Sequence, residues 1–420
     1  MYTHLGYART EGEVGSFDPV LRGLTDDELI ASPLGGSLAL VHTVSPSAPA
    51  PVVTRHAYAD NLKVVLVVAV IVAHATIAWT DVGEWVFTEP PLREPLLSLV
   101  MLVEIVGALF AIPLFFMVAG MFTPRSLQRK GLGRFLIDRS IRLGIPMLFF
   151  ILVMSPPIEY VDPGNADWDA RLEGFWAFVP EILWPPAPGP TWFLGVLLLF
   201  STAYAVTRTL LPARSAPGGP RLWVLGLAAA AVAVVGYFVR IRIPFGEEAW
   251  RLALGQAPAW VVGFSLGVLG GERRWFHPMD PRIARITRRT AWVAMSACVL
   301  VVAIGSVMGT DIETFAGGGT WQSALLGAIE GLLVVGASFW IVDLFRRRFD
   351  HQGRVLGEMS RAAYGAFLFH QIVLVGLVLL IHQVTWAPEL EYVTVTIAGV
   401  VSTFAVASLL LRIPGVSRIV

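Results

Sequence analysis

The sequence predicts an all-α polytopic membrane protein with about ten transmembrane helices and both termini in the cytoplasm. Only 15% of the 420 residues are charged, whereas soluble domains carry about 25%. Hydrophobic residues make up 55% of the chain. They gather in runs of about 20, the length that a helix needs to cross a ~30 Å hydrocarbon core. Basic residues alternate between successive loops, as the positive-inside rule requires.

Ten apolar runs carry the predicted spans. They lie near residues 62–80, 96–122, 135–155, 191–211, 221–240, 250–270, 290–309, 322–345, 360–382 and 392–412. The limits of the fifth and sixth are the least sharply defined, because Arg240, Pro244 and Glu247 interrupt the hydrophobic pattern between them.

The basic residues of the loops predict the orientation. The loops after the second, fourth, sixth and eighth runs are rich in Arg, and the last of these holds Arg346, Arg347, Arg348 and Arg354. The intervening loops hold far fewer basic residues. Because Lys and Arg accumulate on the cytoplasmic side, we expect these even-numbered loops and both termini to be cytoplasmic. The expected location is the cell membrane, inner or plasma.

The first 54 residues differ from the rest of the chain. They are rich in Gly, Pro, Ser and Ala, lack the apolar core of a signal peptide, and end near a Ser-Pro-Ala run at 45–51. Such composition is typical of disorder. We therefore expect a disordered cytoplasmic tail over residues 1–54 and a ten-helix membrane domain over residues 55–420.

Composition excludes several classes of function. The 31 basic residues balance the 31 acidic ones, so no net positive charge indicates a nucleic-acid partner. The one cysteine, Cys298, cannot form an intramolecular disulfide or build a cysteine-based metal site. We interpret it as a small core residue and expect no metal.

One connection is longer than a simple turn. Residues 156–190 are proline-rich, contain Trp168, Trp176 and Trp184, and are predicted to face outside. The tryptophans fit an interfacial belt and equally fit a substrate-binding role.

Four ionisable residues fall inside the predicted spans, where such groups are costly and often functional. They are His74, Glu104, Glu330 and His370. At 1.5 Å per residue, all four are predicted to lie ~15–18 Å from the cytoplasmic face. A shared level suits a buried site, and it also suits polar groups that merely satisfy one another.

Three basic residues are predicted near the cytoplasmic end of the first and third spans. Arg139 and Arg142 are three residues apart and Lys63 opens the first span. Residues three apart share a helix face, and paired guanidinium groups bind phosphate well. A polyanionic ligand entering from the cytoplasm is one interpretation, and snorkelling to lipid head groups is the other.

Five short motifs follow one another along the membrane region. They are Asp60-Asn61-Leu62-Lys63 followed after ten residues by His74, the stretch Phe115–Gly120, Arg139-Ser140-Ile141-Arg142, Trp192-Phe193-Leu194, and Tyr364–Gln371. In this order they resemble the motifs of the acyltransferase-3 family of integral membrane O-acyltransferases. The proline-rich approach to Trp192 resembles the glucan-succinylating subgroup. Two positions depart from the pattern: Lys63 stands where Arg is commoner, and Ala119 replaces the usual Ser.

The resemblance implies transfer of an acyl group from acyl-CoA, as co-substrate, to a hydroxyl of a carbohydrate or another acceptor. It implies that His74 acts as general base or transient acyl acceptor, oriented by Glu330 or Glu104. CoA phosphates would meet Lys63, Arg139 and Arg142. The acceptor side would hold Trp192, Tyr364 and His370, the last of which has an equally good structural interpretation.

Two other classes of protein remain open at this point. Ten helices with ionisable residues at mid-membrane also suit a transporter or flippase of a small anionic or glycolipid substrate. A sensory or structural membrane protein without catalysis is the third class, and it would tolerate replacement of His74. The sequence leaves the acyl chain, the acceptor and the oligomeric state open.

Overall fold

The computed structural model describes residues 57–80, 88–160, 174–175, 179, 183, 186–211, 218–276, 278–311 and 313–416. The tail predicted for residues 1–54 lies outside these residues, as do Trp168, Trp176 and Trp184. The described part is helical and has no strand, apart from one isolated bridge between Ala249 and Leu252.

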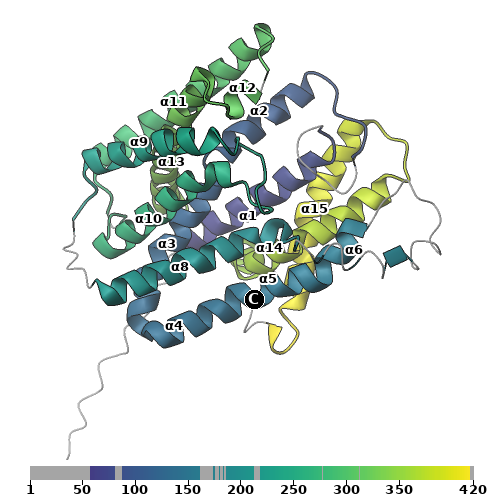
Figure 1. Ribbon diagram of the computed structural model, residues 1–420. Helices are drawn as coiled ribbons and strands as arrows, with labels where there is room; N and C mark the ends of the chain where they lie inside the picture. The colour runs from purple at the N-terminus through teal and green to yellow at the C-terminus, as the bar shows by residue number, and fades with distance from the viewer. Residues whose placement is uncertain are drawn as a thin grey trace, which may run out of the picture. The chain divides into compact units, whose positions relative to one another are not determined.

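The prediction of ten spans is confirmed, because ten helical segments of the described chain are long and apolar enough to cross a membrane. Figure 1 shows their arrangement. The segments are α1 (Ala57–Ile77), α2 (Leu96–Ala108) with α3 (Ala111–Lys130), α4 (Leu132–Arg139) through α5 (Ile145–Phe149) to α6 (Ser155–Tyr160), α8 (Trp192–Leu210), α9 (Leu222–Arg240), α10 (Ala257–Arg273), α11 (Pro281–Val307), α13 (Trp321–Arg348), α14 (Arg354–Ile381) and α15 (Pro388–Leu410). Short helical turns at η4 (Gly189–Thr191), η5 (Leu254–Gln256) and α12 (Glu313–Ala316) connect some of them.

The second span is not the single helix expected over 96–122. It breaks at Leu109–Phe110 into α2 and α3. Pro113 sits in the first turn of α3, where its missing N–H costs nothing, but its ring excludes the carbonyl of residue 109 from a continuous helix. A proline in an otherwise apolar run therefore ends one helix and starts the next.

The third span is not regular either. Two π-helical turns, η2 (Ser140–Gly144) and η3 (Phe150–Met154), flank α5. A π turn shifts the face presented by the following residues and is often found at functional sites. Arg142 lies in η2, just beyond the end of α4 at Arg139, so their spacing does not place them on one regular α-helical face.

Glycines join α3 to α10 at very short distance. Gly263, Gly267 and Gly271 recur every fourth residue of α10, and a Cβ atom on them would lie 2.4, 2.1 and 2.3 Å from carbonyl oxygens of Pro113, Met117 and Met121. Small residues at this spacing let membrane helices pack backbone to backbone. Gly120, in the motif at the end of the second span, faces α10 in the same way, against the Phe264 carbonyl.

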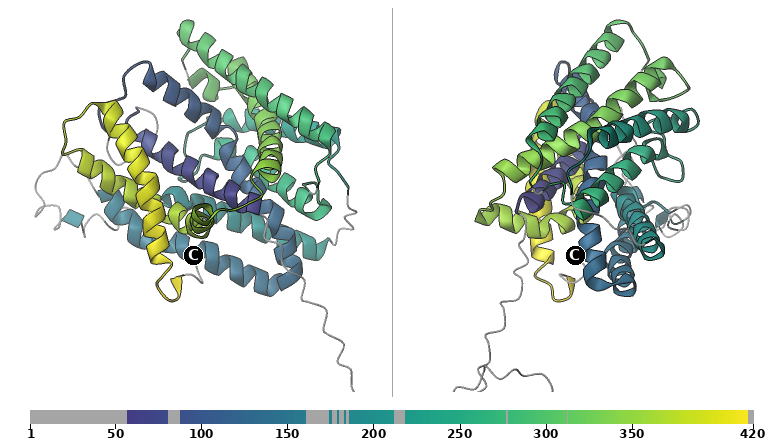
Figure 2. Two further views of the ribbon diagram at one scale, coloured as in Figure 1. Left: turned by 180° about the vertical axis from the view of Figure 1, so that it is seen from behind. Right: turned by 90° about the vertical axis from the view of Figure 1, so that its left-hand side faces the viewer.

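The first turn of α1 is fastened to the loop between α13 and α14. The Asp350 carboxylate accepts the backbone N–H of Tyr58 at 3.0 Å, and the Asn61 amide donates to the carbonyls of Phe349 and His351 at 2.7 and 2.9 Å. Gln352 donates in turn to the Asn61 side chain at 3.0 Å. These bonds fix α1 against α14, and α1 runs through the middle of the helical assembly (Figures 1 and 2).

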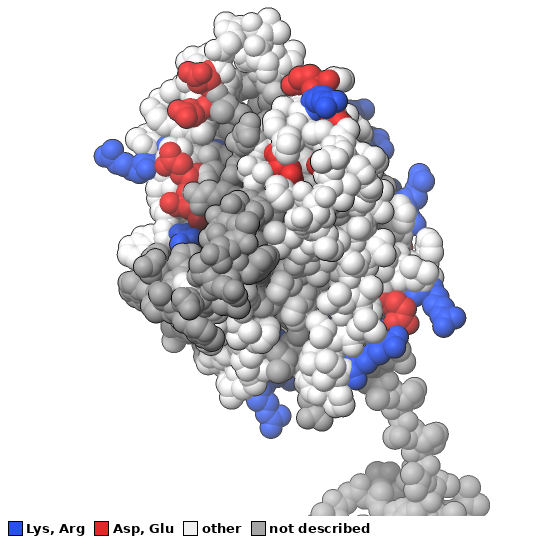
Figure 3. Space-filling model, turned by 90° about the vertical axis from the view of Figure 1, so that its right-hand side faces the viewer, with Lys and Arg blue, Asp and Glu red and all other residues white. Residues whose placement is uncertain are grey.

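The outer surfaces suit a lipid environment. Large apolar side chains such as Val103, Leu199 and Phe238 are about two-thirds exposed, at 62%, 63% and 64%. The face shown in Figure 3 is largely uncharged, and its charged side chains lie mostly toward the edges. The even-numbered spans α3, α8, α10 and α13 end in basic residues, as the predicted orientation requires. The side of the membrane on which they lie stays a prediction.

Candidate active site

Two of the four ionisable residues expected at mid-membrane are in contact. His74 of α1 and His370 of α14 stack edge to face, with ring centroids 4.7 Å apart and an interplanar angle of 78°. The His370 side chain is fully buried, and α1 packs along α14 over much of its length. The pair joins residues 296 positions apart and forms the centre of the candidate site.

Backbone carbonyls determine the tautomer of each ring. Nδ1 of His74 lies 2.9 Å from the Val70 carbonyl, and Nδ1 of His370 lies 2.7 Å from the Phe367 carbonyl. A carbonyl oxygen only accepts, so each Nδ1 donates and each neutral ring carries its lone pair on Nε2. Nε2 of His370 is buried and has no hydrogen-bond partner among the described residues. Imidazole in this tautomer can accept a proton or attack an electrophile at Nε2.

Glu104 of α2 is connected to α1 on a different face from His74. Its carboxylate accepts from the Thr76 hydroxyl at 3.4 Å, and that hydroxyl also lies 3.3 Å from the Tyr392 hydroxyl of α15. Thr76 follows His74 by two residues, which is about 200° around an α-helix. This contact joins Glu104 to Thr76 and not to the imidazole, and the expected role of Glu104 in orienting His74 stays a prediction.

Glu330 of α13 pairs with a residue that sequence reasoning treated only as an interruption between spans. Arg240, at the end of α9, donates from a terminal guanidinium nitrogen to Glu330 at 2.5 Å, and both side chains are almost fully buried. Arg240 also donates from Nε to the Gly255 carbonyl at 3.1 Å and lies over the Phe245 ring at 4.9 Å. The pairing of Glu330 with His74 remains a prediction, and the Arg240 contact gives Glu330 another role.

Two residues outside the motif, Lys130 and Asp138, form ion pairs beside Arg139 and Arg142. Asp138 accepts from Arg142 at 3.2 Å and from Lys130 at 2.6 Å, so it joins α3 to α4 and η2. Arg139 lies over the Phe135 ring at 5.3 Å, and its buried Nε has no partner in the described structure. In the sequence, these ion pairs were indicated only by the basic residues around Lys130 and by the acidic residue at position 138.

Tyr364 connects this basic group to the histidine pair. Its hydroxyl donates to the backbone carbonyl of Arg142, and it lies on α14, six residues before His370. Lys63, the third expected phosphate ligand, pairs with Asp60 at 3.0 Å and lies 5.3 Å from the Phe122 ring of α3. Asp60 and Lys63 of the first motif therefore contact each other.

Aromatic side chains extend from Trp192 to the histidines. Trp192 stacks on Trp260 with centroids 4.6 Å apart. Its neighbour Phe193 lies 5.9 Å from Phe367, which in turn lies 5.9 Å from His370. Trp260 belongs to the same buried cluster, but no motif indicated it. The result is a continuous aromatic wall on one side of the candidate site.

The turn η4 comes close to α14 beside His370. Gly189 has φ +43°, and a Cβ atom there would lie 2.7 Å from both the Gln371 side-chain oxygen and the Phe150 ring. A glycine is required by this approach as well as by the left-handed backbone. The Gln371 oxygen has no hydrogen-bond partner among the described residues. Two neighbouring residues of α14 thus carry unpartnered buried polar atoms, as a binding site for a hydroxyl group would need.

Comparisons with known proteins agree with the motifs. A family model described as an acyltransferase domain, of the acyltransferase-3 type, matches residues 56–412. The chain is 24% identical over 282 residues to a protein named glucans biosynthesis protein C from Salmonella gallinarum (strain 287/91 / NCTC 13346), a match that covers 62% of this chain and 68% of that protein. No solved structure matches the chain.

Proposed function

The chain belongs to the acyltransferase-3 family of membrane acyltransferases, and from this premise we propose that it transfers an acyl group from acyl-CoA to a hydroxyl of a carbohydrate, with His74 at the reacting centre. The observation that carries the proposal is the contact between His74 and the buried His370, in which each Nδ1 donates to a backbone carbonyl of its own helix. In this tautomer each ring has its basic nitrogen at Nε2, the atom that general-base or nucleophilic catalysis would use.

In the first of two routes, His74 is a general base. Nε2 takes the proton of the acceptor hydroxyl as the hydroxyl oxygen attacks the thioester carbonyl carbon. The C–S bond then breaks, and the imidazolium gives its proton to the departing CoA sulfur. The products are an ester and the CoA thiol, and the histidine is neutral again.

In the second route, His74 is a nucleophile. Nε2 attacks the thioester carbon, the CoA thiolate leaves, and the acyl group rests on the ring. The acceptor hydroxyl then attacks the acyl carbon, which frees His74, and the hydroxyl proton ends on the CoA sulfur. His370 lies edge to face against His74, so its lone pair can pass that proton along.

The basic residues of the third span would hold the phosphates of CoA. Arg139 has a buried Nε without a partner in the described chain, which a phosphate oxygen would satisfy. Arg142 is 59% exposed and is held by Asp138, so it is oriented without being enclosed. Lys63 would add a third cation from α1. With the predicted orientation, CoA enters from the cytoplasm.

The acceptor would approach along the aromatic wall. Aromatic faces such as those of Trp192 and Phe193 pack well against sugar rings. The lone pairs of His370 Nε2 and the Gln371 oxygen can accept from sugar hydroxyls. The similarity to a protein named for glucan biosynthesis supports a glucan as acceptor, and the expected location is the cell membrane.

The test is acyl transfer from radiolabelled acetyl-CoA and succinyl-CoA, measured in membranes that contain the wild type, His74→Ala or His351→Ala. His351 is the matched control, because its side chain is exposed and its described hydrogen bond is made by the backbone carbonyl. We expect label in a glycan acceptor with the wild type and the control, and none with His74→Ala. Full transfer by His74→Ala at normal expression would contradict the proposal.

A further inference from the structure

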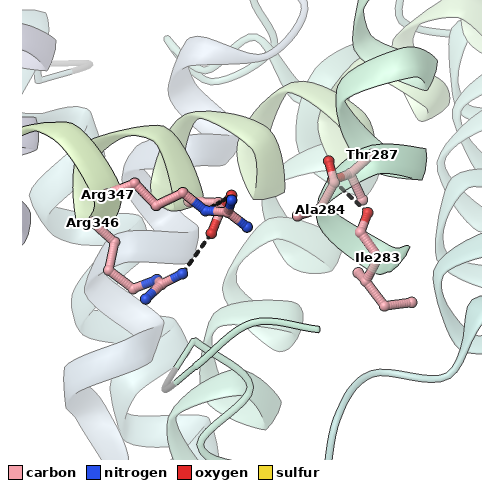
Figure 4. Close-up of polar contacts among 6 residues, drawn as sticks. Ile283, Ala284, Thr287, Arg346 and Arg347 are labelled. Atoms are coloured by element: carbon pink, nitrogen blue, oxygen red, sulfur yellow. Dashed lines mark hydrogen bonds and ion pairs between the residues drawn. The ribbon is translucent and has the colours of Figure 1, made fainter. Parts of the chain in front are cut away.

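A groove of about 350 Å³ lies between the first turns of α11 and the last turns of α13, away from the residues of the candidate site. Arg285 and Arg288 of α11 line it from one side, and Arg347 and Arg348 of α13 from the other. Asp343 is the acidic residue among the lining side chains. Figure 4 shows this region, with Arg346 and Arg347 on α13 opposite Thr287 of α11.

The two helices are in contact at one end of this region. A Cβ atom on Gly336 of α13 would lie 2.8 Å from the Ala291 backbone nitrogen and 3.1 Å from the Thr287 carbonyl of α11. The Thr287 hydroxyl bonds back to its own helix, at 3.0 Å from the Ile283 carbonyl. The helices therefore close on each other at Thr287 and leave the groove at their arginine-bearing ends.

The acidic side chains that the structure describes do not balance the charge of the groove. Asp343 accepts from both Arg346 and Arg347, each at 2.8 Å, so its single charge is shared by two guanidinium groups. Within the described chain, no acidic side chain forms an ion pair with Arg285, Arg288 or Arg348. Four arginines around one shared aspartate give a net positive site, which is complementary to a phosphate group.

The surface beyond the arginines is aromatic and then apolar. Trp340 lines the groove and stacks on Trp292 with centroids 5.5 Å apart. Trp292 is 56% exposed and follows Arg288 by one helical turn. Further along α11, Val293 and Leu300 are exposed as well. Tryptophan prefers the boundary between head groups and hydrocarbon, so the order along α11 matches that of a lipid: charge, interface, hydrocarbon.

We propose that this groove binds the phosphate head group of an anionic phospholipid, whose acyl chains lie along the exposed face of α11. The continuous apolar face favours a lipid over a soluble phosphate, because a soluble ligand would gain nothing from Trp292 and Leu300. Basic grooves between transmembrane helices are suitable sites for such head groups.

The experiment compares lipid binding to purified protein in detergent, by native mass spectrometry and thermal stability, with phosphatidylglycerol and phosphatidylcholine of identical chains. The test variant is Arg288→Gln with Arg348→Gln. The control is Arg289→Gln with Arg354→Gln, which removes the same charge from α11 and α14 outside the groove. Each basic residue near an anionic head group contributes roughly 5-fold in binding. We therefore expect the test variant to lose about 30-fold in phosphatidylglycerol binding, with the control close to the wild type.

Several results would overturn the proposal. If the test and control variants lose phosphatidylglycerol binding equally, the lipid is attracted by the surface charge as a whole and not by this groove. If the test variant binds phosphatidylglycerol as well as the wild type does, the groove is not a lipid site. Stabilisation of the wild type, but not the test variant, by CoA or inorganic phosphate alone would show a soluble phosphate site.

A conservative variant guards against misfolding. Arg288→Lys with Arg348→Lys keeps both charges, and we expect it to retain most of the binding even if the glutamine variant is unstable. Loss of binding in a well-folded lysine variant to the level of the glutamine variant would contradict a charge-driven site. Acyl donor is absent throughout, so the result is independent of the proposed reaction.

Discussion

Two polar pairs join helices of this protein, and they differ in what holds their members. Arg240 and Glu330 join α9 to α13 as an ion pair whose charges compensate each other. His74 and His370 join α1 to α14 through an edge-to-face ring contact, while their Nδ1 atoms bind their own helices. The first pair compensates opposite charges in an apolar interior, whereas the second brings together two imidazole rings that can accept a proton at Nε2 in this tautomer. The first pair is therefore expected to matter for folding and the second for chemistry.

The largest expected effect is that of His74→Ala on transfer. Loss of a general base typically costs 10²–10⁴-fold in rate, and we expect a fall of about 1,000-fold in kcat. His74 is only partly buried, so the melting temperature in detergent should change little. The histidine pair would be structural if His74→Ala lowered the melting temperature strongly and its remaining activity matched the fraction of protein that is folded.

The opposite profile is expected for Glu330→Ala. It leaves the Arg240 charge buried without its partner, and such changes cost about 3–5 kcal/mol of stability. Thermal unfolding in detergent measures this directly, and activity per folded molecule should stay near that of the wild type. The double variant Arg240→Met with Glu330→Met should recover much of the lost stability. Loss of activity in that double variant, at recovered stability, would assign the ion pair a catalytic role after all.

The two pairs also show what the sequence can predict. Hydropathy identified all ten spans, because length and composition determine whether a helix can cross a bilayer. Several helices extend further than expected: α11 begins at Pro281 and α14 at Arg354, whereas the apolar runs begin near 290 and 360. Polar residues continue a helix outside the hydrocarbon, where a hydrophobicity pattern no longer reports it.

Contacts between distant helices were predictable only where a motif indicated them. His74 and His370 stood out as ionisable residues at a similar predicted depth, and the family resemblance included both in its motifs. Nothing in the spacing could connect Arg240 to Glu330 across 90 residues, or place Asp350 at the start of α1. Such pairings depend on which helix faces which, and on breaks such as the one before Pro113 and the π turns around α5. Local sequence does not encode these rotations in a form that periodicity reveals.

A smaller effect is expected at the basic group. Arg142→Ala should raise the apparent KM for the acyl donor by about 10-fold, since a charge-assisted hydrogen bond contributes about 1.5 kcal/mol or more. The KM for the acceptor should be unchanged. Arg129→Ala, on the same predicted side but without a described ion pair, is the matched control. A change confined to the acceptor KM would place CoA elsewhere.

The smallest effect is expected for Glu104→Gln, which tests whether a third ionisable residue near the histidine pair takes part in the reaction. Glutamine keeps an oxygen that accepts from the Thr76 hydroxyl while it removes the carboxylate charge. Because Thr76 lies about 200° around α1 from His74, we expect kcat to stay within about 2-fold of the wild type, since exposed or weakly coupled polar changes cost little. The measurement is kcat in reconstituted membranes. A fall comparable to that of His74→Ala would mean that Glu104 orients the imidazole during turnover, and that α2 moves relative to α1 when substrate binds.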